Sequence, residues 1–282
     1  MSAVKICVIG AGTMGNGIAH VFARAGFEVL LCDTEQRFLD RAVETIRKNL
    51  GREVAAQKLS EEDAASALAR IQSNVGYDGI TACQFAIEAA SEQFEIKKAI
   101  LRELDRALPP HAVIATNTSS ISITRLAAQT TRPQSVIGMH FFNPVPVMKM
   151  VEVVRGLATS QDTVDRVREV AGQLGKHPIE VNDSPGFGSN RVLMPLINEA
   201  AFAVMEGVAT AQAIDDIFKL GMGHPMGPLA VADLVGLDVC LHILRVLEND
   251  LGPKFKPCPL LVRMVDAGWT GKKSGRGFYS YA

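Results

Sequence analysis

The chain has 282 residues, of which 48% are hydrophobic and 21% charged, and its formal net charge at pH 7 is −1. This balance gives no reason to expect nucleic acid or an anionic membrane surface as a partner, and no apolar run approaches the ~20 residues of a membrane span. The N-terminus leads directly into a predicted strand, so we expect no signal or transit segment. Five scattered cysteines without metal or redox spacing indicate a reduced, cytoplasmic protein.

The first 33 residues have the pattern of a dinucleotide-binding unit. An apolar run at residues 4–9, typical of a buried parallel strand, is followed at once by the sequence GAGTMG. Apolar residues at helical spacing come next, and a second apolar run at 28–32 ends at Asp33. A glycine motif alone is weak evidence, but strand, loop, helix, second strand and acid in this order form the full fingerprint. The candidate cofactor residues in the loop are Gly10, Gly12, Thr13, Met14 and Gly15.

Each part of this fingerprint has a physical role in holding a dinucleotide. Gly10 permits a tight turn, Gly12 lets the backbone approach a pyrophosphate, and Gly15 lets the helix pack close to the strand. The helix N-terminus supplies free N–H groups for the phosphates. Asp33 can accept a hydrogen bond from a ribose 2′-hydroxyl and would repel a 2′-phosphate. The sequence therefore predicts NAD rather than NADP, with a plain glycine-rich turn as the alternative.

Strands and helices alternate through the following 150 residues. Two successive helices, at 35–54 and 64–68, precede the third strand, and we interpret them as a helical hairpin that protrudes from the sheet. Further strands are predicted at 71–75, 85–88, 112–116, 135–139, 149–154 and 177–182, and further helices at 92–108, 123–128 and 163–174. This alternation predicts an α/β fold with a parallel, doubly wound sheet of the Rossmann type.

The pattern changes near residues 183–188, and from there nearly every segment has helical period. Helices are predicted at 191–206, 210–220, 227–249 and 260–267. We therefore expect an N-terminal NAD-binding domain, 1–184, and an all-α C-terminal domain, 185–282. Ala200, Ala201, Ala203 and Val204 predict a buried helix face, covered either by a second subunit or by the first domain.

Polar residues gather where several of the later strands end. The sequence ATNTSS at 115–120 closes one strand, and His140 lies at the end of the next, in GMHFFNP. In an open parallel sheet these ends border the ligand crevice. Glu152 lies in an apolar run where a carboxylate is costly to bury unless it is paired. Asn190 opens the first helix of the second domain.

Together these motifs resemble the L-3-hydroxyacyl-CoA dehydrogenase family over essentially the full chain, and within it the stand-alone bacterial 3-hydroxybutyryl-CoA dehydrogenases. The matching motifs are GAGTMG, ATNTSS, GMHFFNP, the Glu twelve residues after the His, DSPGFGSNR and the terminal GKKSGRGFYSY. The resemblance implies reversible, NAD-dependent oxidation of an (S)-3-hydroxyacyl-CoA to a 3-ketoacyl-CoA. It also implies a homodimer formed through the helical domain, which would contribute to the substrate cleft.

The resemblance also assigns the catalytic roles. His140 would take the proton of the 3-hydroxyl as hydride leaves C3 for the nicotinamide, and an imidazole suits this because its ordinary pKa lies near neutral pH. Glu152 would bond the other ring nitrogen, fix its tautomer and stabilise the imidazolium. Ser119 and Asn190 match positions that hold the substrate oxygens. Taken singly, each has a structural alternative, such as a satisfied strand-end His or an Asn that caps a helix.

Other cofactor positions follow from the same resemblance. Asn143 matches a position at the nicotinamide end, and Glu92 and Lys97 match positions near the cofactor ribose. Glu92 and Lys97 could alternatively be solvated helix charges. Lys272 or Lys273 would reach the cofactor from the C-terminal segment, and Lys273 is taken as the candidate.

One departure from the family concerns the predicted hairpin, where relatives carry several lysines for the CoA phosphates. Here alanines stand at such places, and Arg52 and Lys58 are the candidate substitutes, with Lys48 close by. This departure favours the alternative of a dehydrogenase for a free 3-hydroxy acid or sugar acid, such as L-gulonate 3-dehydrogenase. A non-catalytic NAD-binding protein is a further alternative, but it would have no need of a His–Glu pair.

Overall fold

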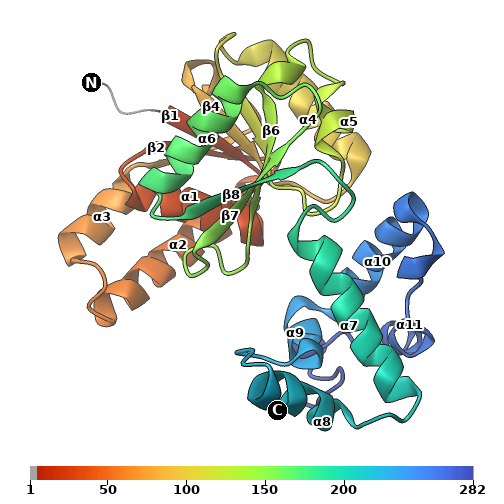
Figure 1. Ribbon diagram of the computed structural model, residues 1–282. Helices are drawn as coiled ribbons and strands as arrows, with labels where there is room; N and C mark the ends of the chain where they lie inside the picture. The colour runs from red at the N-terminus through yellow and green to blue at the C-terminus, as the bar shows by residue number, and fades with distance from the viewer. Residues whose placement is uncertain (1–4, 282) are drawn as a thin grey trace. The chain divides into compact units, whose positions relative to one another are not determined.

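The computed structural model describes residues 5–281 and consists of two compact units, Met1–Asp183 and Ser184–Ala282. The first unit is built on one eight-stranded sheet of order β3-β2-β1-β4-β5-β6-β7-β8 (Figure 1). Its strands are β1 (Lys5–Ile9), β2 (Glu28–Asp33), β3 (Ile71–Val75), β4 (Phe85–Glu88), β5 (Val113–Thr116), β6 (Val136–Phe141), β7 (Met150–Arg155) and β8 (His177–Asn182).

Most neighbouring strands are parallel, as predicted, but β6 and β7 run antiparallel. The expectation of a wholly parallel sheet is therefore wrong at this pair. Only residues 142–149 join β6 to β7, which is too short for the crossover of a dozen or more residues that a parallel pair requires. The reversal brings the beginning of β7 to the same sheet edge as the end of β6.

Helices cover both faces of the sheet, because the side chains of the buried strands alternate between two apolar clusters. Ile6 and Val8 of β1 face one cluster, which includes side chains of α1, α2, α3 and α6, whereas Cys7 and Ile9 face the other, which includes α4 and α5. The helices are α1 (Thr13–Arg24), α2 (Gln36–Ala55), α3 (Glu61–Ala69), α4 (Phe94–Ala107), α5 (Ile123–Ala127) and α6 (Gln161–Gln173). This arrangement is the predicted doubly wound Rossmann-type fold.

The predicted hairpin is formed by α2 and α3, which lie between β2 and β3. The Ser60 hydroxyl caps α3 by accepting a hydrogen bond of 3.0 Å from the backbone N–H of Asp63. Leu39 and Ile46 of α2 and Ala67 of α3 are buried in the same cluster as the apolar side of α1. The hairpin is thus packed on α1 and forms part of the layer that covers this face.

The second unit is helical, as predicted, with a break that the sequence pattern did not indicate. Its helices are α7 (Ser189–Met205), α8 (Ala211–Asp216), α9 (Pro228–Val235), α10 (Leu237–Leu251) and α11 (Pro259–Asp266), and a π-helical turn, Ile217–Gly221, follows α8. The predicted single helix 227–249 is two helices. Gly236 separates them with a φ of +106°, a conformation that an α-helix cannot contain. No helix among residues 5–281 is long and apolar enough to cross a lipid bilayer.

Two of the four small residues that were expected to form a buried face of α7 are covered by the second unit itself. Ala201 is buried in the cluster formed with α9, α10 and α11, and Ala200 packs with Ile214 and Leu229. The expectation that a second subunit or the first domain buries this face is therefore wrong for Ala200 and Ala201, whereas Ala203 and Val204 are half-buried and the prediction for them stays open. Within this unit the large apolar side chains that remain exposed include Val208, Ile217 and Leu220.

His20 is a buried titratable group of α1, where it faces α2. Its side chain is 1% exposed, and its Nε2 lies 3.4 Å from Glu53, which already accepts a hydrogen bond of 2.9 Å from Arg24. Burial, together with the positive charge of Arg24, lowers the pKa of His20 from 6.5 to about 4. The folded protein therefore holds this imidazole neutral at neutral pH.

This shift predicts an acid-dependent loss of stability. Between the unfolded pKa of 6.5 and the folded value of about 4, the unfolded chain binds the additional proton, so the free energy of unfolding falls as the pH is lowered. The contribution is on the order of 3 kcal/mol. Urea unfolding of the wild type and of His20→Gln across this window measures it, and we expect the variant to show the shallower pH dependence. Equal pH dependence in the two proteins would contradict the assignment.

Candidate active site

The glycine loop between β1 and α1 has the geometry that a dinucleotide requires. Gly10 has a φ of +104°, and a Cβ added at Gly15 would lie 1.7 Å from the Gly10 carbonyl oxygen, so the helix can approach the strand only without a side chain there. A Cβ added at Gly12 would meet no atom within 4 Å. The backbone at Gly12 is therefore open to a ligand, and α1 begins at the next residue, with Thr13 and Met14 in its first turn.

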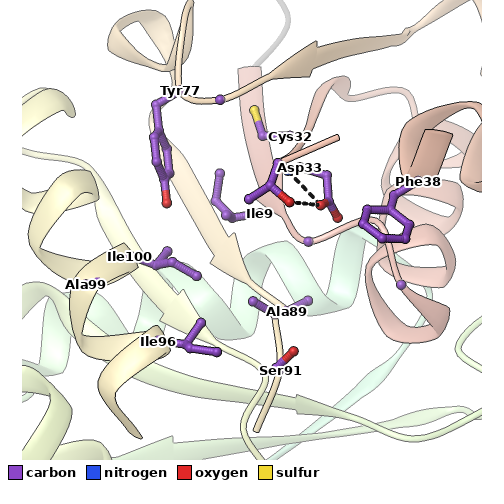
Figure 2. Close-up of a pocket in the computed structure, with 15 residues that line it drawn as sticks. Ile9, Cys32, Asp33, Phe38, Tyr77, Ala89, Ser91, Ile96, Ala99 and Ile100 are labelled. Atoms are coloured by element: carbon purple, nitrogen blue, oxygen red, sulfur yellow. Dashed lines mark hydrogen bonds between the residues drawn. The ribbon is translucent and has the colours of Figure 1, made fainter. Parts of the chain in front are cut away.

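A cavity of about 580 Å³ lies beside this loop at the carboxyl ends of β1 and β2. Figure 2 shows Tyr77 with Ile96 and Ile100 of α4 on one side of the cavity and Phe38 of α2 on the other. The walls are largely apolar, and Asp33 is the acidic residue among those that line it. A pocket of this size and character suits the adenosine portion of a dinucleotide.

Asp33 also holds the loop in place. One carboxylate oxygen accepts a hydrogen bond of 2.6 Å from the backbone N–H of Ala11, and the other accepts one of 2.6 Å from that of Thr34. The Thr34 hydroxyl also donates to Oδ1, at 3.2 Å, so Oδ2 is the oxygen that retains capacity for a ribose hydroxyl. Asp33 therefore links the shape of the glycine loop to the end of β2, where it was predicted to select NAD.

His140 and Glu152 face each other across the antiparallel pair β6–β7. The two residues are directly opposite in the strand register, and Nδ1 of His140 lies 2.8 Å from Oε2 of Glu152. The side chains are buried, with residue exposures of 7% and 2%. The Phe142 ring lies with its centroid 4.7 Å from that of the imidazole. Because Nδ1 is hydrogen-bonded to the Glu152 carboxylate, Nε2 is the ring nitrogen that can exchange a proton with a ligand.

Glu92 holds the polar segment that follows β5. One of its oxygens, Oε1, accepts hydrogen bonds from the Thr118 hydroxyl (2.5 Å) and from the backbone N–H groups of Ser119 (2.8 Å) and Ser120 (3.2 Å). Burial acts to raise the pKa of Glu92, but the Lys97 ammonium and the bonds from Thr118 and Ser119 outweigh it, so the pKa lies below its usual value. Glu92 is thus an ionised anchor for the segment that carries Ser119.

Lys97 is not a solvated helix charge. It is 1% exposed, and its ammonium contacts Glu88 Oε1 at 2.8 Å, Glu92 Oε2 at 3.3 Å and the Ala90 carbonyl oxygen at 3.2 Å. Glu92 precedes α4 rather than lying within it, since the helix begins at Phe94. The alternative interpretation of these two residues as exposed charges is therefore wrong.

Two residues of this region were missed by the sequence reasoning, Glu88 and Asn117. Glu88 is fully buried at the end of β4 and binds Lys97, and an acid that ends a four-residue apolar run was the available signal. Asn117 accepts a hydrogen bond of 2.9 Å on its side-chain oxygen from the backbone N–H of Phe141. This bond ties the segment after β5 to the strand end that carries His140.

A second groove, of about 480 Å³, lies between the glycine loop, α2 and the segment after β6. Asn143 lines it on one side, and Arg41, Thr45 and Asn49 of α2 line it on another. The predicted CoA ligands Arg52 and Lys58 are exposed and do not line this groove. Arg52 donates a hydrogen bond of 3.1 Å to the Asn49 side chain.

The remaining predicted residues belong to the second unit. Asn190 is buried in the first turn of α7, at 8% exposure. Lys273 is exposed and its ammonium lies 2.7 Å from Asp238 Oδ2, near the start of α10. Their roles toward the cofactor and substrate stay predictions.

Comparison with known proteins identifies the family. The family model for the NAD-binding domain of 3-hydroxyacyl-CoA dehydrogenase matches residues 5–184, and the model for the C-terminal domain matches residues 186–281. The chain belongs to the 3-hydroxyacyl-CoA dehydrogenase family. It is an NAD-dependent oxidoreductase, and the prediction of NAD from the fingerprint at the N-terminus is confirmed.

Individual relatives match over the whole chain. A probable 3-hydroxybutyryl-CoA dehydrogenase of Bacillus subtilis is 51% identical over 100% of this chain and 98% of its own. The crystal structure of (S)-3-hydroxybutyryl-CoA dehydrogenase from Ralstonia eutropha superposes with a TM-score of 0.96 at 48% identity, covering 100% of both chains. A 3-hydroxybutyryl-CoA dehydrogenase of Bradyrhizobium diazoefficiens is 50% identical over 98% of this chain and 95% of its own.

The position of Asp33 predicts a test of cofactor choice. In Asp33→Ala, NADH loses a charge-assisted hydrogen bond, and we expect its Kd to rise about 10- to 100-fold. The Kd of NADPH should rise less or fall, because the repulsion of its 2′-phosphate is removed. Fluorescence titration of both cofactors measures the ratio. Glu35→Ala, which removes a nearby exposed carboxylate outside the cavity lining, is the control and should leave the ratio unchanged. An unaltered ratio in Asp33→Ala would contradict this role.

Proposed function

We propose that the protein interconverts (S)-3-hydroxybutyryl-CoA and acetoacetyl-CoA with NAD as the hydride carrier. The observation that carries the chemistry is the buried His140–Glu152 pair, with 2.8 Å between Nδ1 and Oε2. The relatives matched over the whole chain support the choice of substrate, since their names specify 3-hydroxybutyryl-CoA. A dinucleotide-binding protein without catalysis would not require this acid–base pair.

The residues of the first unit have separate roles in the reaction. His140 takes the proton of the 3-hydroxyl on Nε2, and Glu152 holds the imidazole by Nδ1 and stabilises the positive charge that the ring acquires. The C3 hydrogen leaves as hydride while the C–O single bond becomes the 3-keto group, and bound NAD supplies the acceptor for that hydride. In the reverse direction His140 returns the proton to the keto oxygen. Ser119 binds a substrate oxygen.

The cofactor is held by the glycine loop and Asp33, and the polar end of the substrate by α2. Gly10, Gly12 and Gly15 shape the site for the pyrophosphate, with backbone N–H groups from Thr13 and Met14 at the helix N-terminus. Arg41 lines the groove beside this loop, whereas Arg52 and Lys58 do not. We therefore favour Arg41 over Arg52 and Lys58 as the cation that binds the CoA phosphates.

Two further properties are part of the proposal. The protein acts as a homodimer, supported by exposed apolar side chains of the second unit, such as Val208 and Leu220, at 73% and 86% exposure. The reaction takes place in the cytoplasm, which is supported by five cysteines that are all free and buried.

The substrate assignment is tested by oxidation of NADH with acetoacetyl-CoA, measured beside free acetoacetate and beside NADPH. We expect fast turnover only with NADH and the thioester, because the CoA portion supplies binding free energy that the free acid lacks. Turnover with an uncoupled hydroxy or keto acid alone would move the protein to the free-acid alternative. No turnover with either would contradict the enzymatic proposal.

The groove assignment predicts unequal effects of two arginine substitutions. Arg41→Ala should raise the KM for acetoacetyl-CoA about 10-fold, the loss expected for a charge-assisted hydrogen bond, while kcat and the Kd of NADH stay near wild-type values. Arg52→Ala is the matched control and should change the KM less. A larger effect from Arg52→Ala would indicate that Arg52, as first predicted, binds the CoA phosphates. A raised Kd for NADH in Arg41→Ala would indicate that Arg41 binds the dinucleotide instead.

A further inference from the structure

The buried acid at the end of β4, Glu88, has no role in the reaction proposed above. Its side chain is fully buried, and its carboxylate accepts hydrogen bonds from Lys97 Nζ (2.8 Å), the backbone N–H of Ala90 (2.7 Å) and the Thr116 hydroxyl (2.6 Å). These partners come from α4, from the segment after β4 and from the end of β5. Glu88 thus joins three parts of the chain at the sheet edge that carries His140.

Burial of such an ion pair is weak evidence of a stabilising role. Withdrawing a carboxylate and an ammonium from water costs several kcal/mol for each, and an apolar pair of similar volume is often as stable. The pair Glu88–Lys97 therefore calls for a reason other than stability. Its connections supply one, because two of them lead to the segment that carries Ser119.

Two routes of hydrogen bonds run from Glu88 to that segment. The first passes through Lys97 to Glu92, whose Oε1 accepts the backbone N–H of Ser119. The second passes through Thr116, the last residue of β5, whose hydroxyl donates to Glu88 and accepts from the backbone N–H of Thr118 at 3.3 Å. Both routes fix the backbone on either side of Ser119.

The first route depends on the negative charge of Glu88. Two carboxylates, of Glu88 and Glu92, share one ammonium, and Lys97 lies closer to Glu88 (2.8 Å) than to Glu92 (3.3 Å). If Glu88 loses its charge, the ammonium is expected to pair fully with Glu92 and to draw that carboxylate away from Ser119. The segment 117–120 would then lose its principal acceptor.

We propose that Glu88 is a positioning residue for the dehydrogenase reaction, which acts through Lys97, Glu92 and Thr116 to hold Ser119 in register with His140. This inference rests on the proposed function, because it assigns Ser119 to the substrate oxygen. Glu88 itself touches neither substrate nor cofactor. Its effect on the reaction therefore exists only while Ser119 is present.

The test is a double-mutant cycle between Glu88→Gln and Ser119→Ala. Glu88→Gln should lower kcat about 10- to 100-fold, as expected for a misplaced substrate-binding group, with less than about a 3-fold change in the KM for acetoacetyl-CoA. In the Ser119→Ala background the same substitution should have little further effect on kcat. Additive losses in the double variant would overturn the proposal.

A matched control distinguishes an effect on the position of Ser119 from an effect on the stability of the fold. Asp105 and Arg132 form another buried ion pair, with side-chain exposures of 8% and 9%, and Asp105 lies on α4 like Lys97. Asp105→Asn should lower the unfolding temperature without changing kcat. A fall in kcat for Asp105→Asn as large as that for Glu88→Gln would also overturn the proposal.

Two further measurements cover the case in which Glu88→Gln does not fold. Thr116→Val removes the second route alone and should lower kcat in a way that again depends on Ser119. Amide hydrogen exchange of the cofactor-free protein should show faster exchange at Ser119 and Ser120 in Thr116→Val but not in Asp105→Asn. Unchanged exchange would contradict the inference, whereas loss of acetoacetyl-CoA turnover in the wild type would contradict only the proposed function.

Discussion

The structure of the candidate site depends on the antiparallel pairing of β6 with β7. This pairing sets His140 directly opposite Glu152 and thereby supplies the partner that a buried carboxylate needs. A shift of the register by one residue would turn one of the two side chains to the opposite face of the sheet. Strands β1 to β6 are parallel to one another, so their carboxyl ends bring the glycine loop, Asp33 and the segment after β5 to the same edge.

Hydrogen bonds between strand ends fix the polar segments at this edge. Asn117 joins the end of β5 to that of β6, Glu92 binds the segment 118–120, and Asp33 binds the glycine loop. In each case a side chain satisfies backbone N–H groups that the sheet leaves unpaired. Loops with such partners can hold functional groups as firmly as the strands do, which a proton transfer over hydrogen-bond distance requires.

The sequence alone predicted those features that local chemistry determines. The glycine loop with its flanking strands, the two successive helices after β2 and the positions of the later strands depend on near neighbours, and these predictions are confirmed. The resemblance of the motifs predicted the family as well, and it too is confirmed. The pairing of His140 with Glu152 was expected only through that resemblance, since twelve residues separate them.

Features that depend on distant parts of the chain were not predictable in this way. The direction of β7, the break at Gly236 and the burial of Ala200 and Ala201 inside their own unit are set by packing that periodicity does not encode. Lys97 illustrates the difference most clearly. Its helical surroundings left a solvated charge open as an alternative, whereas two acids from outside the helix enclose it.

The central claim is that the paired imidazole of His140 transfers the substrate proton. Its most direct test is the kcat of His140→Ala with acetoacetyl-CoA, measured together with the Kd of NADH. The account predicts a fall in kcat of about 10²- to 10⁴-fold, the usual contribution of a general acid–base residue, with NADH binding preserved. Turnover that remains near the wild-type rate in this variant would contradict the account.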